Sequence, residues 1–231
     1  MAERTAVLFD LDDTLYPERR FAVSACAAVA LQVSADTGIA ADALGRVLVA
    51  RLRAGRRADL LQTACEASGL PQTEVPRLLE VVRRHVPRLR LPRESRDTLT
   101  RLRRDGHRLG VLTNGLPDTQ RGKVAALGVG DLVDAVVYAE ECAPGGKPAA
   151  ACFETLLSRL EVEARAAVFV GDHPDKDVAG AAAVGLRAIW MVRHRPRDVD
   201  AAVGAHAVTR RLADLPPLVK RLLEDAHVAP C

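Results

Sequence analysis

Two carboxylates stand at alternate positions in the segment Asp10-Leu11-Asp12, directly after the apolar run Ala6-Val7-Leu8. An apolar run of this kind predicts a short buried strand. A carboxylate at the end of a buried strand is costly unless a cation or a proton compensates its charge. Asp10 and Asp12 therefore predict a metal site that carries out chemistry, rather than a solvated turn.

Further polar side chains follow the later apolar runs. Thr113 and Asn114 follow one predicted strand, Lys147 lies in the loop after the next, and Asp172 follows a fourth, with Asp177 about one turn further on. In open α/β folds the ligand binds beyond the carboxyl ends of the strands. These side chains are therefore expected to converge on one rim of the sheet.

The set of side chains suits phosphoryl transfer. An Asp carboxylate can attack phosphorus and form an aspartyl-phosphate, and a second carboxylate two residues away can act as acid and then as base. Sites rich in Asp oxygens suit Mg²⁺. Thr113, neighbouring backbone N–H groups and Lys147 would bind the phosphoryl oxygens and offset their charge.

The elements that must position these residues alternate along the chain beyond Pro92. Apolar runs that read as strands alternate with amphipathic segments that read as helices. This alternation predicts an α/β fold with a Rossmann-like parallel sheet that carries helices on both faces. The predicted strands span residues 109–112, 135–138, 166–170 and 188–192, and the predicted helices span residues 94–105, 120–127, 148–160 and 175–184.

The segment between the first strand and the later ones has a different pattern. From about Glu18 to Leu91 it is rich in Ala, Leu and Arg at helical spacing, which predicts several packed helices. We expect a core domain of residues 1–15 and 93–231 and an inserted all-helical cap domain of residues 16–92. Because the insertion leaves directly after the acidic loop, it would lie over the site as a lid.

Composition limits the other possibilities. The 231 residues are 48% hydrophobic, which is enough for a core domain with a smaller second domain. The formal net charge of +3 does not by itself indicate binding to nucleic acid. No apolar run approaches the roughly 20 residues that cross a bilayer. The N-terminus lacks a signal-peptide pattern, and the five cysteines, which include Cys231, indicate a reducing compartment. We expect a cytoplasmic monomer or homodimer with no nucleic-acid or membrane partner.

The four polar segments, in this order and each behind a predicted strand, resemble the motifs of the haloacid dehalogenase (HAD) superfamily. The resemblance is to the phosphatase branch that has a helical cap inserted after the first motif. Dehalogenase members lack an acid at the position of Asp12, so this residue favours phosphate-ester chemistry. The matching motifs are Asp10-x-Asp12-x-Thr14, Thr113-Asn114-Gly115, Lys147-Pro148 and Gly171-Asp172-x-x-x-x-Asp177.

The resemblance implies a Mg²⁺-dependent phosphatase of small phosphorylated metabolites and a role for each motif residue. Asp10 would be the nucleophile, and Asp12 would be the general acid and base. The implied Mg²⁺ ligands are Asp10, Asp172 and the backbone carbonyl of Asp12. The implied phosphate-binding residues are Thr113, Asn114 and Lys147. Asp177 would support the metal site.

Several alternatives stay open. A phosphomutase shares these motifs but transfers the phosphoryl group to a second sugar hydroxyl, and a metabolite-binding or regulatory protein could use the same fold without catalysis. Arg83 and His85 could recognise an anionic substrate or form a solvated basic helix end. His173 could belong to the site or to an exposed loop. We expect Asp13 to serve the turn rather than catalysis. Successive side chains of an extended chain point to opposite sides, so Asp13 would point away from Asp10 and Asp12.

Overall fold

The computed structural model describes residues 4–193 and 204–228, and the chain forms two compact units. One unit, the sheet unit, comprises residues 1–17, 90–120 and 127–231. The other, the helical unit, comprises residues 18–89 and 121–126. The helix α6 (Pro117–Leu127) therefore contributes residues to both units.

A six-stranded parallel sheet forms the centre of the sheet unit in the described part of the chain, with the strand order β3-β2-β1-β4-β5-β6. The central position of β1 explains why all four of its residues are buried. The predicted parallel α/β fold is confirmed. The strands are β1 (Ala6–Phe9), β2 (Arg108–Thr113), β3 (Ala135–Tyr138), β4 (Ala167–Gly171), β5 (Arg187–Met191) and β6 (Ala207–Thr209).

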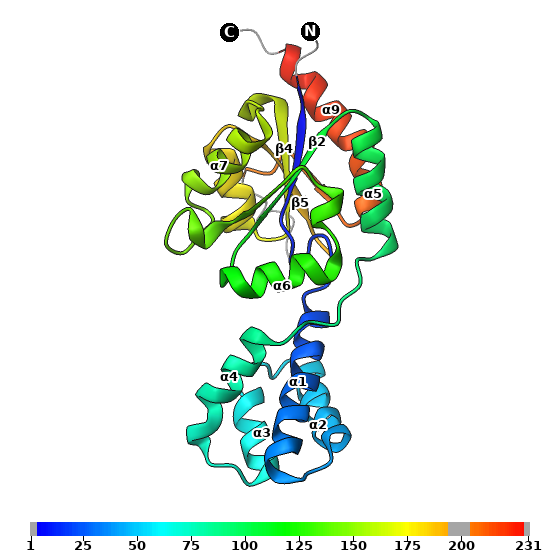
Figure 1. Cartoon of the computed structure of the whole chain (residues 1–231). Coiled ribbons are helices and arrows are strands. Elements are labelled where there is room, and N and C mark those ends of the chain that lie inside the picture. The colour runs from blue at the N-terminus through cyan, green and yellow to red at the C-terminus, as the bar shows by residue number, and fades with distance from the viewer. Residues whose placement is uncertain (1–3, 194–203, 229–231) are drawn as a thin grey trace. The chain divides into compact units, whose positions relative to one another are not determined.

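Helices cover both faces of this sheet (Figure 1). The helices α7 and α8 pack together on one face, and α5 and α9 pack together on the other. On the α7 face, Phe153 of α7 meets Phe169 of β4 edge to face, with ring centroids 5.1 Å apart, within a continuous apolar core. The helices are α5 (Arg93–Arg104), α7 (Ala150–Leu160), α8 (Gly180–Ala183) and α9 (Leu215–Val228).

The structure departs from the sequence prediction in the last third of the chain. The predicted helix at 175–184 is a π-helical turn, Pro174–Ala179, followed by the single turn of α8. The strand β6 and the helix α9 were not predicted. The strand β6 has only three residues and one of them is buried, so its apolar pattern is too short to identify a strand. The 3₁₀ turns span Gln72–Glu74, Gly130–Leu132, Ala139–Glu141, Ala164–Ala166 and Leu212–Asp214.

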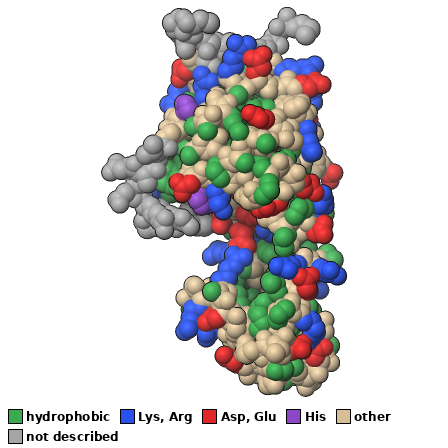
Figure 2. Space-filling model, turned by 90° about the vertical axis from the view of Figure 1, so that its left-hand side faces the viewer, with side chains coloured by type: hydrophobic (Ala, Val, Ile, Leu, Met, Phe, Trp, Pro, Cys, Tyr) green, Lys and Arg blue, Asp and Glu red, His purple; other side chains and the backbone are tan. Residues whose placement is uncertain are grey.

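Four helices make up most of the helical unit, and they pack around an apolar core of their own, which includes Val29, Leu48 and Leu78. On the face that Figure 2 shows, basic side chains lie next to acidic ones, and ion pairs join residues such as Arg77 and Glu74. That this unit acts as a cap over the site stays a prediction. The helices are α1 (Arg19–Thr37), α2 (Ala41–Arg53), α3 (Leu60–Ser68) and α4 (Val75–Arg84).

Two observations concern membrane-spanning helices and the state of the cysteines. Among the described residues there is no helix with the length and apolar character needed to span a bilayer. Cys26, Cys65, Cys142 and Cys152 are free thiols, whereas Cys231 lies outside the described residues. The cytoplasmic location stays a prediction.

Candidate active site

The first strand delivers Asp10 to the carboxyl edge of the sheet. The Asp10 N–H donates to the Val170 carbonyl of the neighbouring strand at 2.9 Å, and the residue is only 6% exposed. Burial raises the pKa of the Asp10 carboxyl well above its usual range, and the nearby carboxylates of Asp177 and Asp12 raise it further, while Lys147 acts in the opposite direction. An ionised Asp10 therefore needs additional positive charge beside it.

Lys147 supplies the positive charge that opposes this rise in the pKa of Asp10. Its ammonium group lies 2.6 Å from Asp10 Oδ1 and 2.7 Å from Asp177 Oδ1, and it donates to the Leu112 carbonyl at 3.0 Å. The side chain is 2% exposed. Burial alone would lower the pKa of Lys147, but the two carboxylates outweigh this effect and hold it above its ordinary value. Lys147 is therefore a buried cation that bridges two buried acids.

The acids at this edge also suit a divalent cation. Oxygen atoms of Asp10, Asp172 and Asp177 all lie within 4.8 Å of one another, and the Lys147 ammonium contacts two of these three carboxyl groups. Carboxylate oxygens are the donors that Mg²⁺ prefers. Because the two oxygens of Asp177 already contact Lys147 and the His173 N–H, Asp10 and Asp172 are the better candidates for direct ligands.

A glycine allows Asp177 to reach this cluster. A Cβ atom added to Gly171 would lie 2.4 Å from the Asp177 Cβ, which is far inside van der Waals contact. The next residue, Asp172, is fixed from the other side, because the Trp190 indole N–H donates to its backbone carbonyl at 2.9 Å. The end of β4 is therefore shaped so that Asp172 and Asp177 can both approach Asp10.

Asp12 is held by two residues that the sequence analysis did not select. The Tyr16 hydroxyl donates to Asp12 Oδ1 at 2.6 Å, and the Gln120 amide Nε2 donates to Asp12 Oδ2 at 2.9 Å. The same Gln120 nitrogen lies 2.5 Å from Thr113 Oγ1. No motif pointed to Tyr16 or Gln120, since their roles depend on side-chain directions that spacing alone does not give.

Asn114 holds the loop that carries Lys147. Its side chain accepts a hydrogen bond from the Lys147 N–H at 2.9 Å and donates to the carbonyls of Gly145 and Lys147 at 3.2 Å. These contacts fix the backbone on which the buried ammonium depends. The predicted contact of Asn114 with phosphate stays a prediction beside this observed positioning role.

The remaining candidates lie around or away from the cluster. Asp13 has a φ of 56° and its N–H donates to the Tyr16 carbonyl, so its backbone forms the turn. The His173 ring accepts the N–H groups of Asp175 and Lys176 at the start of the π-helical turn. Arg83 and His85 belong to the helical unit, and their predicted role in substrate recognition stays a prediction.

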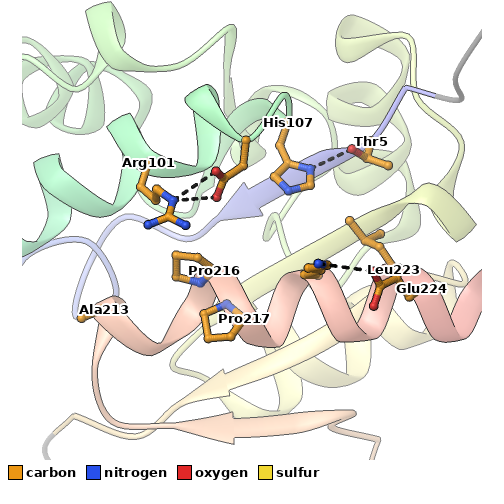
Figure 3. A pocket seen from close by; sticks show the side chains of 10 residues that line it. Thr5, Arg101, His107, Ala213, Pro216, Pro217, Leu223 and Glu224 are labelled. Atoms are coloured by element: carbon orange, nitrogen blue, oxygen red, sulfur yellow. Dashed lines mark hydrogen bonds and ion pairs between the residues drawn. The ribbon is translucent and has the colours of Figure 1, made fainter.

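A hollow of about 680 Å³ lies at the opposite, amino edge of the sheet, between the end of α5 and α9 (Figure 3). Its charged side chains pair with one another, since Arg101 Nε donates to the Asp105 carboxylate at 3.0 Å and Lys220 lies 3.8 Å from Glu224. His107 hydrogen-bonds to Thr5 at 2.7 Å. None of the acidic cluster lines this hollow, so it is separate from the candidate active site.

The fold and the cluster together define a class of protein: a Rossmann-like α/β protein with an acidic, lysine-containing site at the carboxyl edge of its sheet. The chain belongs to the haloacid dehalogenase-like hydrolase family, whose sequence model matches residues 5–185. The predicted family is thus confirmed.

The names of individual relatives describe different activities. The chain is 31% identical to a ribulose-1,5-bisphosphate 5-phosphatase of Halopiger xanaduensis, over 91% of this chain and 93% of that protein. It is 38% identical to a phosphoserine phosphatase of Thermus thermophilus over 59% of this chain, which spans about half (55%) of that relative. A solved 2-haloacid dehalogenase of Pseudomonas syringae is 32% identical, with a TM-score of 0.63 over 94% of this chain and 99% of that chain.

Proposed function

We propose that the chain is a Mg²⁺-dependent phosphatase that hydrolyses small phosphorylated metabolites through an aspartyl-phosphate on Asp10. The observation that carries the proposal is the buried bridge of Lys147 between Asp10 and Asp177, with Asp172 beside it. This arrangement keeps a carboxylate at the sheet edge next to fixed positive charge and to oxygen donors for a cation. Such a site can stabilise negative charge that develops on a transferred phosphoryl group.

In the first step, an Asp10 carboxylate oxygen attacks phosphorus while the bond from phosphorus to the ester oxygen breaks. Asp12 gives its proton to that leaving oxygen, so the alcohol departs neutral. Lys147 and Thr113 offset the charge on the phosphoryl oxygens. Mg²⁺, held by Asp10, Asp172 and the Asp12 backbone carbonyl, would supply further charge neutralisation when bound.

In the second step, water attacks the phosphorus of the aspartyl-phosphate. Asp12, now a carboxylate, accepts a proton from this water as the bond between phosphorus and the Asp10 oxygen breaks. Inorganic phosphate leaves and the Asp10 carboxylate is regenerated. One carboxyl group thus serves as acid and then as base, which requires that Asp12 keep the same position through both steps.

The substrate class follows from the relatives and from the chemistry of the site. Two of the relatives named above act on phosphate esters of small carbon compounds, phosphoserine and ribulose-1,5-bisphosphate, according to their names. A site with a general acid for an alcohol leaving group suits esters of this kind. We therefore propose a small phosphorylated metabolite as substrate.

The test is a screen of the purified chain against phosphorylated metabolites with release of inorganic phosphate as the readout. Asp10→Asn should abolish release, because an amide does not attack phosphorus. Asp13→Asn is the matched control: it makes the same change three residues away, at a positive φ that Asn tolerates, and should retain activity. Unchanged turnover by Asp10→Asn would refute the proposal, and a phosphorylated product in place of free phosphate would identify a mutase instead.

A further inference from the structure

One buried amide connects two parts of the proposed reaction. Gln120 is 2% exposed, and its Nε2 lies 2.9 Å from Asp12 Oδ2 and 2.5 Å from Thr113 Oγ1. Asp12 follows β1, Thr113 ends β2, and Gln120 lies on α6, so three elements meet at this nitrogen. The proton-transfer residue and the phosphate-binding hydroxyl are therefore tied to a single group.

The chemistry of the partners fixes the orientation of this amide. In the ionised form that Asp12 has in the second step, its oxygens accept hydrogen bonds and have no proton to donate, so the NH₂ side of Gln120 faces Asp12. The second N–H then donates to Thr113 Oγ1. Because the Thr113 oxygen accepts this bond, its own hydroxyl proton stays available for a phosphoryl oxygen.

The turn before α6 sets the direction in which the chain enters the helix that carries Gln120. Gly115 has a φ of 121°, and a Cβ atom at this position would lie 3.4 Å from Gln120 Cδ. The Gln120 N–H donates to the Leu116 carbonyl at 3.0 Å, which fixes the first turn of the helix. The positive φ of Gly115, which L side chains rarely adopt, thus shapes the turn from which Gln120 approaches the loop.

Asp12 is fixed from both sides by this arrangement. The Tyr16 hydroxyl donates to Oδ1 at 2.6 Å, while Gln120 donates to Oδ2. Two donors on different oxygens determine the plane of the carboxyl group. The loss of Gln120 therefore changes the direction in which Asp12 can give or take a proton, while Tyr16 still retains the residue near the site.

We propose that Gln120 is a positioning residue that holds Asp12 in the orientation for proton transfer and directs the Thr113 hydroxyl toward the phosphoryl group. The inference rests on the proposed phosphatase function. The positioning role can be tested separately from that function, because assistance by a general acid matters most when the leaving group is poor. A positioning defect at Asp12 must therefore affect alkyl phosphates more than activated aryl phosphates.

The experiment compares kcat and KM of the wild type and of Gln120→Met for p-nitrophenyl phosphate and for an alkyl phosphate found in the substrate screen. Methionine keeps the length of the side chain and removes both N–H donors. General acid–base catalysis is worth roughly 10²–10⁴-fold. We expect kcat for the alkyl phosphate to fall by about 10–100-fold, a part of that range, because Tyr16 still holds Asp12. The kcat for p-nitrophenyl phosphate should fall much less.

Gln120→Glu provides a second variant in case the first does not fold. It places a carboxyl oxygen against Asp12 and should show the same or a larger difference between the two substrates. Leu127→Ala is the control for packing, since Leu127 is a buried residue of the same helix that is 2% exposed. It should lower thermal stability without changing the ratio of the two kcat values.

Equal losses for both substrates in the Gln120 variants would overturn the inference and leave the proposed function intact. The same change of ratio in Leu127→Ala would also overturn it, because the effect would then come from helix packing. No phosphate release by the wild type from any substrate would overturn the proposed function, and the positioning role with it.

Discussion

Replacing Lys147 with methionine tests the electrostatic arrangement of the site directly. Methionine preserves an unbranched apolar stem of similar length but removes the ammonium that lies 2.6 Å from Asp10 and 2.7 Å from Asp177. The side chains of all three residues are at most 8% exposed. The substitution therefore leaves two neighbouring buried carboxyl groups without their shared counter-charge.

The size of the effect follows from this burial. Removing one partner of a buried ion pair typically costs about 3–5 kcal/mol, because the remaining charge stays buried and uncompensated. For a chain of this length, 1 kcal/mol corresponds to roughly 2–4 °C in Tm, so the melting temperature should fall by about 6–20 °C. The measurement is thermal denaturation of the metal-free protein at neutral pH, followed by circular dichroism.

A surface lysine provides the matched control. The Lys220 ammonium lies 3.8 Å from Glu224, and these side chains are 75% and 65% exposed. Exposed pairs at this helical spacing contribute about 0.3–0.5 kcal/mol, so Lys220→Met should change Tm by no more than about 2 °C. The contrast between the two variants isolates the effect of burial from the loss of a lysine.

Two further results separate charge from packing in the Lys147→Met variant. Adding Asp177→Asn should recover part of the lost stability, because it removes one uncompensated charge while the asparagine oxygen can still accept the His173 N–H. Added Mg²⁺ should also stabilise the variant, by about 2.7 kcal/mol at a concentration 100-fold above its Kd. Equal stability of Lys147→Met and Lys220→Met would refute the reasoning.

Three other predictions concern the metal, the packing and the pH dependence. Exhaustive chelation should abolish phosphate release and Mg²⁺ should restore it, and Asp172→Asn should lower the Mg²⁺ affinity measured by calorimetry; activity that survives chelation contradicts this. Gly171→Ala should cost about 1–3 kcal/mol in urea denaturation, because the new Cβ would lie 2.4 Å from the Asp177 Cβ; wild-type stability would show that the strand end can relax. Burial lowers the pKa of His107, so its neutral form is favoured in the folded state. The stabilisation that neutral His107 contributes is complete above about pH 6.5, the pKa of histidine in the unfolded chain. It is lost as the pH falls through the lower pKa that His107 has in the folded state. Urea denaturation at pH 7.5 and 5.5 should therefore show a smaller loss for His107→Gln than for the wild type.

The sequence predicted the sheet and the residues at its edge because both depend on local patterns. Each of the strands β1, β2, β3 and β4 is a short apolar run, and the polar residue that follows it is visible in the chain. Once parallel pairing is assumed, Asp10, Thr113 and Asp172 must come to one edge. The structure places Asp10 and Asp172 in one cluster, with Lys147 in contact with Asp10.

The contacts of Tyr16 and Gln120 could not be predicted in the same way. Tyr16 reaches Asp12 because the chain turns tightly at Asp13, where φ is 56°. Gln120 reaches Asp12 because Gly115 turns the chain and α6 begins at Pro117. These directions depend on backbone angles and rotamers, which hydrophobic periodicity does not specify. The strand β6 was missed for another reason, since three residues with one buried side chain carry almost no periodic signal.

The two hydrogen bonds to Asp12 also bear on the choice between phosphatase and dehalogenase chemistry. The solved dehalogenase is 32% identical to this chain, so overall similarity does not separate the two activities. A halide leaving group is stable as an anion and needs no proton, whereas an alkoxide that leaves a phosphate ester gains greatly from one. Tyr16 holds one oxygen of the Asp12 carboxyl group and Gln120 holds the other, so in the proposed reaction Asp12 would have a defined orientation for that proton transfer. Halide displacement needs no such proton donor, so an oriented carboxyl group at position 12 supports phosphate-ester hydrolysis as the proposed reaction.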